Sequence, residues 1–84
     1  MYSIEFRASA ARQFRKLPEQ VQRRLRQKID LLATNPRPHG YEPLEGEPGY
    51  RVKVGDYRIV YDIQDQMLMV LILRVAHRRH VYDR

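Results

Sequence analysis

The sequence predicts an α+β fold made of an N-terminal strand, a helical hairpin and a three-stranded antiparallel meander, with the helices packed on one face of a single sheet. Three observations predict it: alternating apolar side chains over residues 2–7, apolar side chains at helical spacing over residues 10–32, and three β-type segments over residues 50–75. The chain has 84 residues, 43% of them hydrophobic and 31% charged, so we expect residues 1–84 to form a single globular domain.

The first element is predicted to be a strand over residues 2–7, because Tyr2, Ile4 and Phe6 alternate with polar residues and would form one buried face. Ser9 is then expected to cap a helix of about nine residues. Apolar side chains share one face of that helix at Ala10, Phe14 and Leu17.

A second helix is predicted to begin at Pro18, whose missing N–H costs nothing in the first helical turn. One apolar stripe follows at Val21, Leu25, Ile29 and Leu32. Asn35-Pro36 is expected to end the helix, because the residue before a proline is pushed out of the α region. We expect the basic side chains on the other faces of this helix to be solvated rather than bound to RNA.

Residues 35–49 are predicted to form a long loop, since they hold four of the five prolines and three of the four glycines. Leu44 is the best candidate in this loop for an anchor into the core. The segments 50–54, 57–63 and 67–75 then form the meander, joined by Gly55-Asp56 and by residues 64–66. The last segment is apolar on both faces, which predicts a central position in the sheet.

The two-residue turn fixes which side chains lie opposite one another in the first hairpin of the meander. Lys53 is expected to face Arg58, and both should point away from the helices together with Arg51. Like charges across a sheet repel, so a bound phosphate would offset a cost that is otherwise relieved only by screening in water. A second group of cations, from Arg74 to Arg79, is expected to return near the same surface.

The net charge agrees with a polyanionic partner. Sixteen Lys and Arg against ten Asp and Glu give +6 with His neutral, and the pI is about 10.1. Most of these cations are arginines, whose planar guanidinium suits bidentate contact with phosphate, although general solubility would explain the same excess.

The sequence also limits the protein's location and metal chemistry. It contains no cysteine, which excludes disulfides and thiolate metal sites. No metal site is expected from His77 and His80, because a third ligand is missing. The first residues include Glu5 and Arg7 and no apolar stretch long enough for a signal peptide or a membrane span. We therefore expect a cytoplasmic protein without contact to a membrane.

Residues 50–61 (YRVKVGDYRIVY) and 74–82 (RVAHRRHVY), preceded by the loop motif 43–46 (PLEG), resemble the C-terminal half of the RelE/ParE toxin superfamily. The order of the predicted elements resembles that superfamily over nearly the whole chain. The resemblance implies the toxin of a type II toxin–antitoxin system, a ribosome-dependent endoribonuclease that cleaves mRNA in the A site by metal-free attack of a 2′-hydroxyl, with no cofactor. Two alternatives remain open: a ParE-like inhibitor of DNA gyrase, and an inactive toxin that acts only as an antitoxin-binding co-repressor.

The same resemblance implies residue roles. Catalytic roles fall on Lys53, Arg58, Arg78 and Tyr82. RNA binding is expected of Arg51 and, from the second group of cations, of Arg74, His77 and Arg79. Glu42 competes with Lys53 as general base, because a related branch resembling YoeB has a glutamate at that position.

The implied partners are a cognate RelB-like antitoxin, the ribosome and mRNA. Operator DNA would be bound only through the antitoxin complex.

Overall fold

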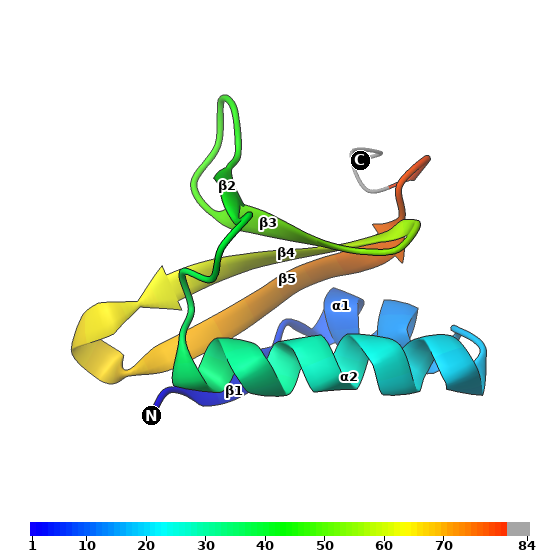
Figure 1. Ribbon diagram of the computed structural model, residues 1–84, viewed down its shortest axis with the longest axis horizontal. Helices are drawn as coiled ribbons and strands as arrows, with labels where there is room; N and C mark the ends of the chain where they lie inside the picture. Colours follow the sequence, from blue (N-terminus) through cyan, green and yellow to red (C-terminus); the bar gives the residue numbers. More distant parts are fainter. Residues whose placement is uncertain (81–84) are drawn as a thin grey trace.

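The computed structural model describes residues 1–80, and it arranges five strands in one mixed sheet of order β1-β5-β4-β3-β2. The elements in chain order are β1 Ser3–Phe6, α1 Ala8–Arg15, α2 Glu19–Thr34, β2 Glu42–Pro43, β3 Tyr50–Val54, β4 Tyr57–Gln64, a 3₁₀ turn Asp65–Met67, and β5 Met69–His77. Both helices cover the same face of the sheet, and the loop that carries β2 rises on the opposite side (Figure 1). The predicted α+β class is confirmed.

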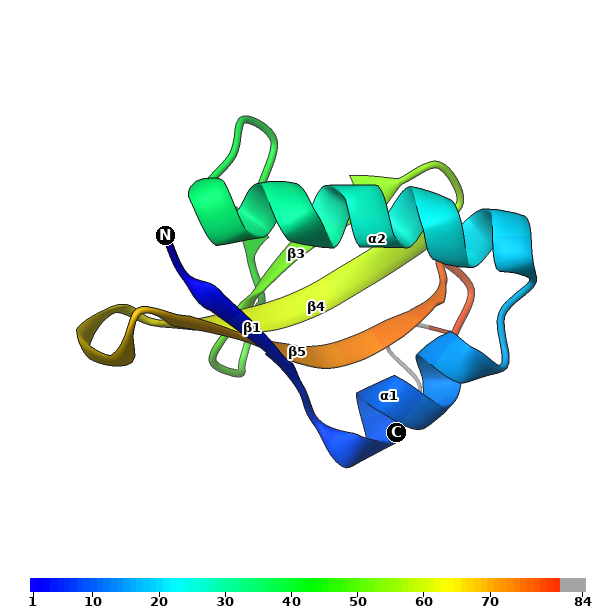
Figure 2. The ribbon, with the colours of Figure 1, turned by 90° about the horizontal axis from the view of Figure 1, so that it is seen from below.

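The central position predicted for the last strand is also confirmed, since β5 lies between β1 and β4. β1 joins it in parallel, with Ile4 opposite Val70 and Phe6 opposite Ile72. β3, β4 and β5 form the antiparallel meander. Figure 2, seen from below, shows α1 and α2 in front of this sheet, with β4 and β5 visible between them.

The helices do not begin where the sequence predicted: α1 begins two residues before the position that a Ser9 cap implies, and α2 begins one residue after Pro18. Ser9 lies inside α1 and is not its cap; Arg7 occupies the N-cap without a side-chain hydrogen bond. The reason is that Arg7 still donates its backbone N–H to Ile72 O at 2.9 Å while its own carbonyl accepts from Ala11 N at 2.9 Å, so strand and helix meet at one residue. Pro18 likewise sits at the N-cap of α2 instead of its first turn.

The core lies between the helices and the sheet, and the apolar stripe predicted on α2 supplies Leu25, Ile29 and Leu32 to it. Tyr61 is fully buried in this layer, and its hydroxyl donates a 2.7 Å hydrogen bond to the carbonyl of Pro36. Burial raises the pKa of Tyr61, which keeps the hydroxyl protonated as a donor.

The loop over residues 35–49 is more ordered than the sequence predicted. Glu42 and Pro43 form a short edge strand paired with Arg51 and Tyr50 of β3. Leu44 is not the anchor into the core. It stays half-buried on the open side of the sheet, while the Tyr41 ring packs 5.4 Å from that of Tyr50 and contacts the core.

A polar cluster joins the N-terminus, the loop and the β4–β5 connection. The guanidinium of Arg37 donates to both carboxylate oxygens of Asp65, at 2.8 and 3.3 Å, and the Tyr2 hydroxyl donates to the same carboxylate at 2.6 Å. Hydrogen bonds from Arg37 and Tyr2 lower the pKa of Asp65.

Within residues 1–80, neither helix has the length and apolar composition required to cross a membrane.

Candidate nucleic-acid interface

The face of the sheet that lies away from the helices, called here the open face, carries the cations that the turn register predicted. Lys53 pairs with Arg58 and Arg51 pairs with Val60, in the predicted register. Val52 and Ile59 alternate with these residues and are buried in the core. Because successive side chains point to opposite faces of a strand, Arg51, Lys53 and Arg58 point away from the helices.

A bulge in β5 determines which cations of that strand lie on the open face with Arg51, Lys53 and Arg58. Tyr61 pairs with Ile72 and Val60 with Arg74, so Leu73 is an extra residue on β5. The extra residue shifts the alternation, and Arg74 falls on the open face beside Val60. His77 instead pairs with Tyr57 on the helix side, where the two rings meet edge to face at 5.5 Å. The structure therefore brings Arg74 to the open face and does not bring His77 there.

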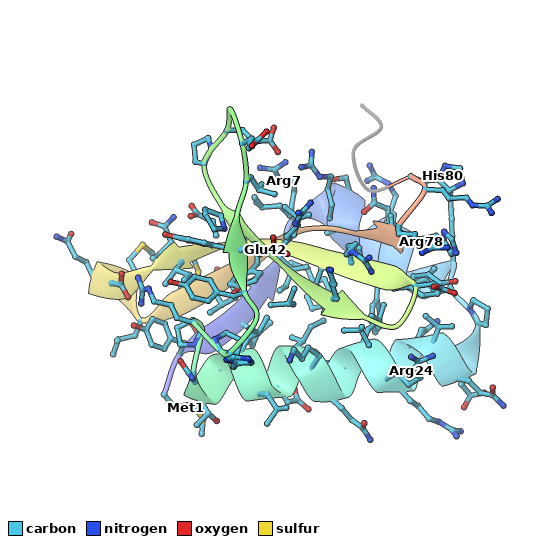
Figure 3. The ribbon with its side chains drawn as sticks, turned by 45° about the horizontal axis from the view of Figure 1, so that its top comes forward. Met1, Arg7, Arg24, Glu42, Arg78 and His80 are labelled. Carbon is cyan, nitrogen blue, oxygen red and sulfur yellow. The ribbon has the colours of Figure 1, made fainter. Side chains whose placement is uncertain are left out.

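The remaining predicted residues lie at the end of β5. Arg78 and Arg79 are exposed in the turn after the strand, and Figure 3 shows Arg78 and His80 at this end of the sheet. Tyr82 lies outside the described residues. No group of three or more His, Cys, Asp or Glu side chains suited to a metal ion occurs in residues 1–80.

The first half of the open face, called here the hairpin-tip half, consists of Lys53, Arg58 and Arg78 around the Gly55-Asp56 turn. Arg58 folds toward the turn and donates from its Nη1 to the carbonyls of Gly55, at 3.0 Å, and Tyr57, at 2.9 Å. These acceptors are neutral, so they fix the guanidinium without cancelling its charge. The Lys53 side chain is exposed and makes no hydrogen bond or ion pair within the described part of the chain.

Arg78 is held at the same turn. Its backbone N–H donates to the carbonyl of Asp56 at 2.6 Å, and its Nε lies 3.9 Å from an Asp56 carboxylate oxygen. Both side chains are more than half exposed, at 58% and 67%. An ion pair this long and this exposed neutralises little, so the net charge of the hairpin-tip half stays positive.

The second half, called here the loop half, consists of Arg51 and Arg74 together with two glutamates of the loop. Arg51 Nη2 lies 3.4 Å from Glu42 Oε2, and Arg74 Nη2 donates to Glu47 Oε1 at 2.5 Å. The Arg74 and Glu47 side chains are only 22% and 29% exposed. In this half each guanidinium is therefore paired with a carboxylate.

A pocket of about 510 Å³ opens between the loop and the sheet in the loop half. Its walls are formed by Glu42, Pro43, Leu44, Glu45 and Glu47 of the loop and by the two arginines of the sheet. Arg74 Nε is buried there without a hydrogen-bond acceptor among the described residues. The pocket thus combines carboxylate acceptors, guanidinium donors and an apolar wall.

Sequence reasoning missed two side chains near these sites. Glu47 was not singled out, since nothing in its neighbourhood indicates that it meets Arg74, 27 residues later. Arg24 of α2 was expected to be solvated. It is exposed, as expected, but its guanidinium also contacts the β3–β4 turn at Gly55, in space that the Cβ of any other residue would occupy.

Comparison with known sequences agrees with this architecture. A family model described as the ParE toxin of the type II toxin–antitoxin system parDE matches residues 4–82. The toxin RelG of Mycobacterium tuberculosis is 33% identical over 99% of this chain and 98% of its own length. The mRNA interferase toxin RelE of Escherichia coli is 30% identical over 92% of this chain and 83% of its own length.

Solved structures give the same result. The toxin in the intact E. coli RelBE toxin–antitoxin complex superimposes with a TM-score of 0.82 at 29% identity, covering 92% of this chain and 96% of that one. A chain of the RelBE2 complex of M. tuberculosis matches with a TM-score of 0.82 at 31% identity, over 92% and 98% of the two chains. The family model, the relatives and the shared fold together place this chain in the RelE/ParE superfamily of type II toxin–antitoxin toxins.

Proposed function

We propose that this chain, as one toxin domain over residues 1–84, is an endoribonuclease that cleaves mRNA in the ribosomal A site. The observation that carries the proposal is the hairpin-tip half, where Lys53, Arg58 and Arg78 present positive charge on an open sheet face. Support comes from relatives at 30–33% identity, one of them named an mRNA interferase. A positive surface of this kind attracts the phosphate backbone of RNA.

The proposed reaction begins when a base removes the proton from a 2′-hydroxyl, whose oxygen then attacks the adjacent phosphorus. The bond to the 5′-oxygen breaks and this oxygen takes up a proton from water, giving a 2′,3′-cyclic phosphate and a 5′-hydroxyl, while the base returns its own proton to the solvent. Lys53 is the proposed base. Arg58 and Arg78 stabilise the charge that develops on the phosphorane oxygens, and Arg58 is prepared for this because two carbonyls already orient it.

Two further residues keep their proposed roles. Glu42 is the alternative base, although it lies beside Arg51 in the loop half and away from the turn. Tyr82 is proposed to stack on a base or to orient the attacking hydroxyl.

The proposed partner, apart from ribosome and mRNA, is a RelB-like antitoxin. Similar toxins have been solved in complexes named RelBE and RelE–RelB. With a net charge of +6, this toxin would attract an acidic antitoxin that covers the open face. Binding to operator DNA is proposed only for the toxin–antitoxin complex, and the place of action is proposed to be the cytoplasm.

The test is cleavage of mRNA on programmed ribosomes. Purified protein added to ribosomes stalled at a defined codon should cut within the A-site codon, and free mRNA should be cut far more slowly. Primer extension locates the cut, and the cyclic phosphate end identifies the chemistry. Intact mRNA on ribosomes from several bacteria would contradict the proposal.

A second candidate is inhibition of DNA gyrase, which is favoured by the match to a family model described as the ParE toxin. Such a toxin would bind a protein and leave RNA intact. Adding the purified chain to gyrase with relaxed plasmid DNA separates the two: loss of supercoiling or trapped double-strand breaks support gyrase inhibition. Normal supercoiling together with cut mRNA supports the nuclease.

A further inference from the structure

The two halves of the open face offer different chemistry to an RNA strand. In the hairpin-tip half, Lys53 and Arg58 present net positive charge, which suits a phosphate. In the loop half, Arg51 and Arg74 are each paired with a glutamate, so an approaching phosphate meets carboxylates as well as guanidiniums. A phosphate has no donor for those carboxylates, and the loop half is therefore a poor phosphate site.

The pocket in the loop half suits a ligand that has both hydrogen-bond donors and hydrogen-bond acceptors. Glu42 accepts one long hydrogen bond, from Arg51, and its other carboxylate oxygen has no hydrogen-bond partner among the described residues. The guanidinium of Arg74 has five N–H donors and makes one hydrogen bond in the same part of the chain, to Glu47. Pro43 and Leu44 add an apolar wall on which a flat ring can lie.

We infer that this pocket binds a nucleobase of the RNA, and that guanine fits it best. Guanine offers adjacent N–H donors on its Watson–Crick edge for a carboxylate, and the O6 and N7 acceptors that arginine binds in bidentate fashion. Uracil has a single N–H donor, and cytosine and adenine lack a ring N–H beside their amino group. The inference rests on the proposed function only in taking RNA as the ligand.

The position of the pocket agrees with this role. Arg51 lines the pocket and Lys53 lies in the hairpin-tip half, two residues along β3 and so about 7 Å away. A base in the pocket and a phosphate at Lys53 can thus belong to one strand in contact with both halves. Glu47 has a positioning role here, since it orients Arg74 and adds a second carboxylate to the pocket wall.

The experiment is a titration of the folded protein with GMP, AMP, CMP and UMP, followed by NMR signals of the arginine Nε–H groups. All four probes carry the same phosphate, so differences among them report on the base. We expect GMP to bind about tenfold more tightly than UMP or CMP, with the largest changes at Arg74 and Arg51. Equal affinities for the four nucleotides, or an Arg74 signal that does not move with any of them, would overturn the inference.

Variants separate base recognition from support of the loop. Glu47→Gln keeps the shape and a hydrogen bond to Arg74 but removes the charge, and we expect it to lose the preference for GMP. Glu47→Asp keeps the charge and should retain the preference at lower affinity. Glu19→Gln removes a carboxylate paired with Arg23 on α2, outside the pocket, and should bind all four nucleotides as the wild type does. A Glu47→Gln protein that folds and still prefers GMP would contradict the inference.

The titration needs no cleavage, so a failure of base recognition and a failure of mRNA cleavage are observed separately. If the protein does cut mRNA, the positions of the cuts give a second readout. Glu47→Gln should change the bases found at the cut sites, whereas loss of mere support for the loop would slow cleavage equally at every site.

Discussion

The hairpin-tip half and the loop half of the open face carry the same type of side chain and differ in what holds it. Arg58 is fixed by two backbone carbonyls, whereas Arg74 is fixed by the Glu47 carboxylate. Two opposite charges at 4 Å attract with about 4 kcal/mol at the effective dielectric of a protein surface, so a carboxylate competes directly with a phosphate for the guanidinium. The surroundings of an arginine, and not its presence, decide whether it serves as a phosphate site.

The first prediction tests this difference on the reaction itself. Lys53→Ala should reduce the single-turnover rate of mRNA cleavage on ribosomes by about 10² to 10⁴-fold, the range expected for loss of a general base. Arg51→Ala, two residues away in the loop half, should reduce it by less than about tenfold, because its charge is already paired with Glu42. Equal losses from the two variants would show that the division of the open face has no consequence for catalysis.

The second prediction concerns the stability of the loop half. Chemical denaturation of Arg74→Ala, Glu47→Ala and the double variant should give a coupling free energy of about 1 to 2 kcal/mol, because this pair is hydrogen-bonded and largely buried. The matching cycle for Arg51 and Glu42, which are farther apart and more exposed, should give about 0.5 kcal/mol. A reversed order would mean that distance and burial do not govern these pairs.

The third prediction uses the salt dependence of RNA affinity to count the phosphates that the protein contacts. For a single strand, each neutralised phosphate contributes about −0.7 to the slope of log affinity against log salt concentration. Arg58→Ala should make the slope for a short RNA less negative by about that amount. Arg74→Ala should leave it unchanged, although it weakens binding, since its partner on the RNA is proposed to be a base. A slope that changes equally in both variants would assign a phosphate to each.

Only the hairpin-tip half of the open face could be predicted from the sequence. In the hairpin-tip half, Gly55-Asp56 fixes the register, and the positive φ of 60° at Gly55 is the backbone conformation that a tight hairpin turn requires there. The facing of Lys53 and Arg58 therefore follows from local sequence and is confirmed.

The loop half depends on features that no local pattern encodes. The extra residue Leu73 in β5 decides that Arg74 reaches the open face and that His77 does not, and a continuous apolar strand gives no sign of where such a bulge lies. The pairing of Glu47 with Arg74 joins segments 27 residues apart. Long-range contacts of this kind depend on how the loop folds back on the sheet, which composition alone leaves open.

The smallest expected effect is on the pH dependence of stability, and it concerns the Arg37–Asp65 ion pair. This pair lies away from the open face and serves as a reference for the pairs in the loop half. Because Arg37 and Tyr2 lower the pKa of Asp65 below its value in the unfolded chain, about 3.9, their contribution to stability is present above that pH and is lost as the pH falls through the folded value. The free energy of unfolding of the wild type should therefore fall more steeply with acid than that of Asp65→Asn, when both are measured by urea denaturation from about pH 6 to pH 2.5. The difference should be small, since this carboxylate is half exposed. Parallel curves would show that this exposed bidentate pair adds nothing measurable to the free energy of unfolding. They would then support the view that an ion pair stabilises the fold only when it is buried, as Glu47 and Arg74 are.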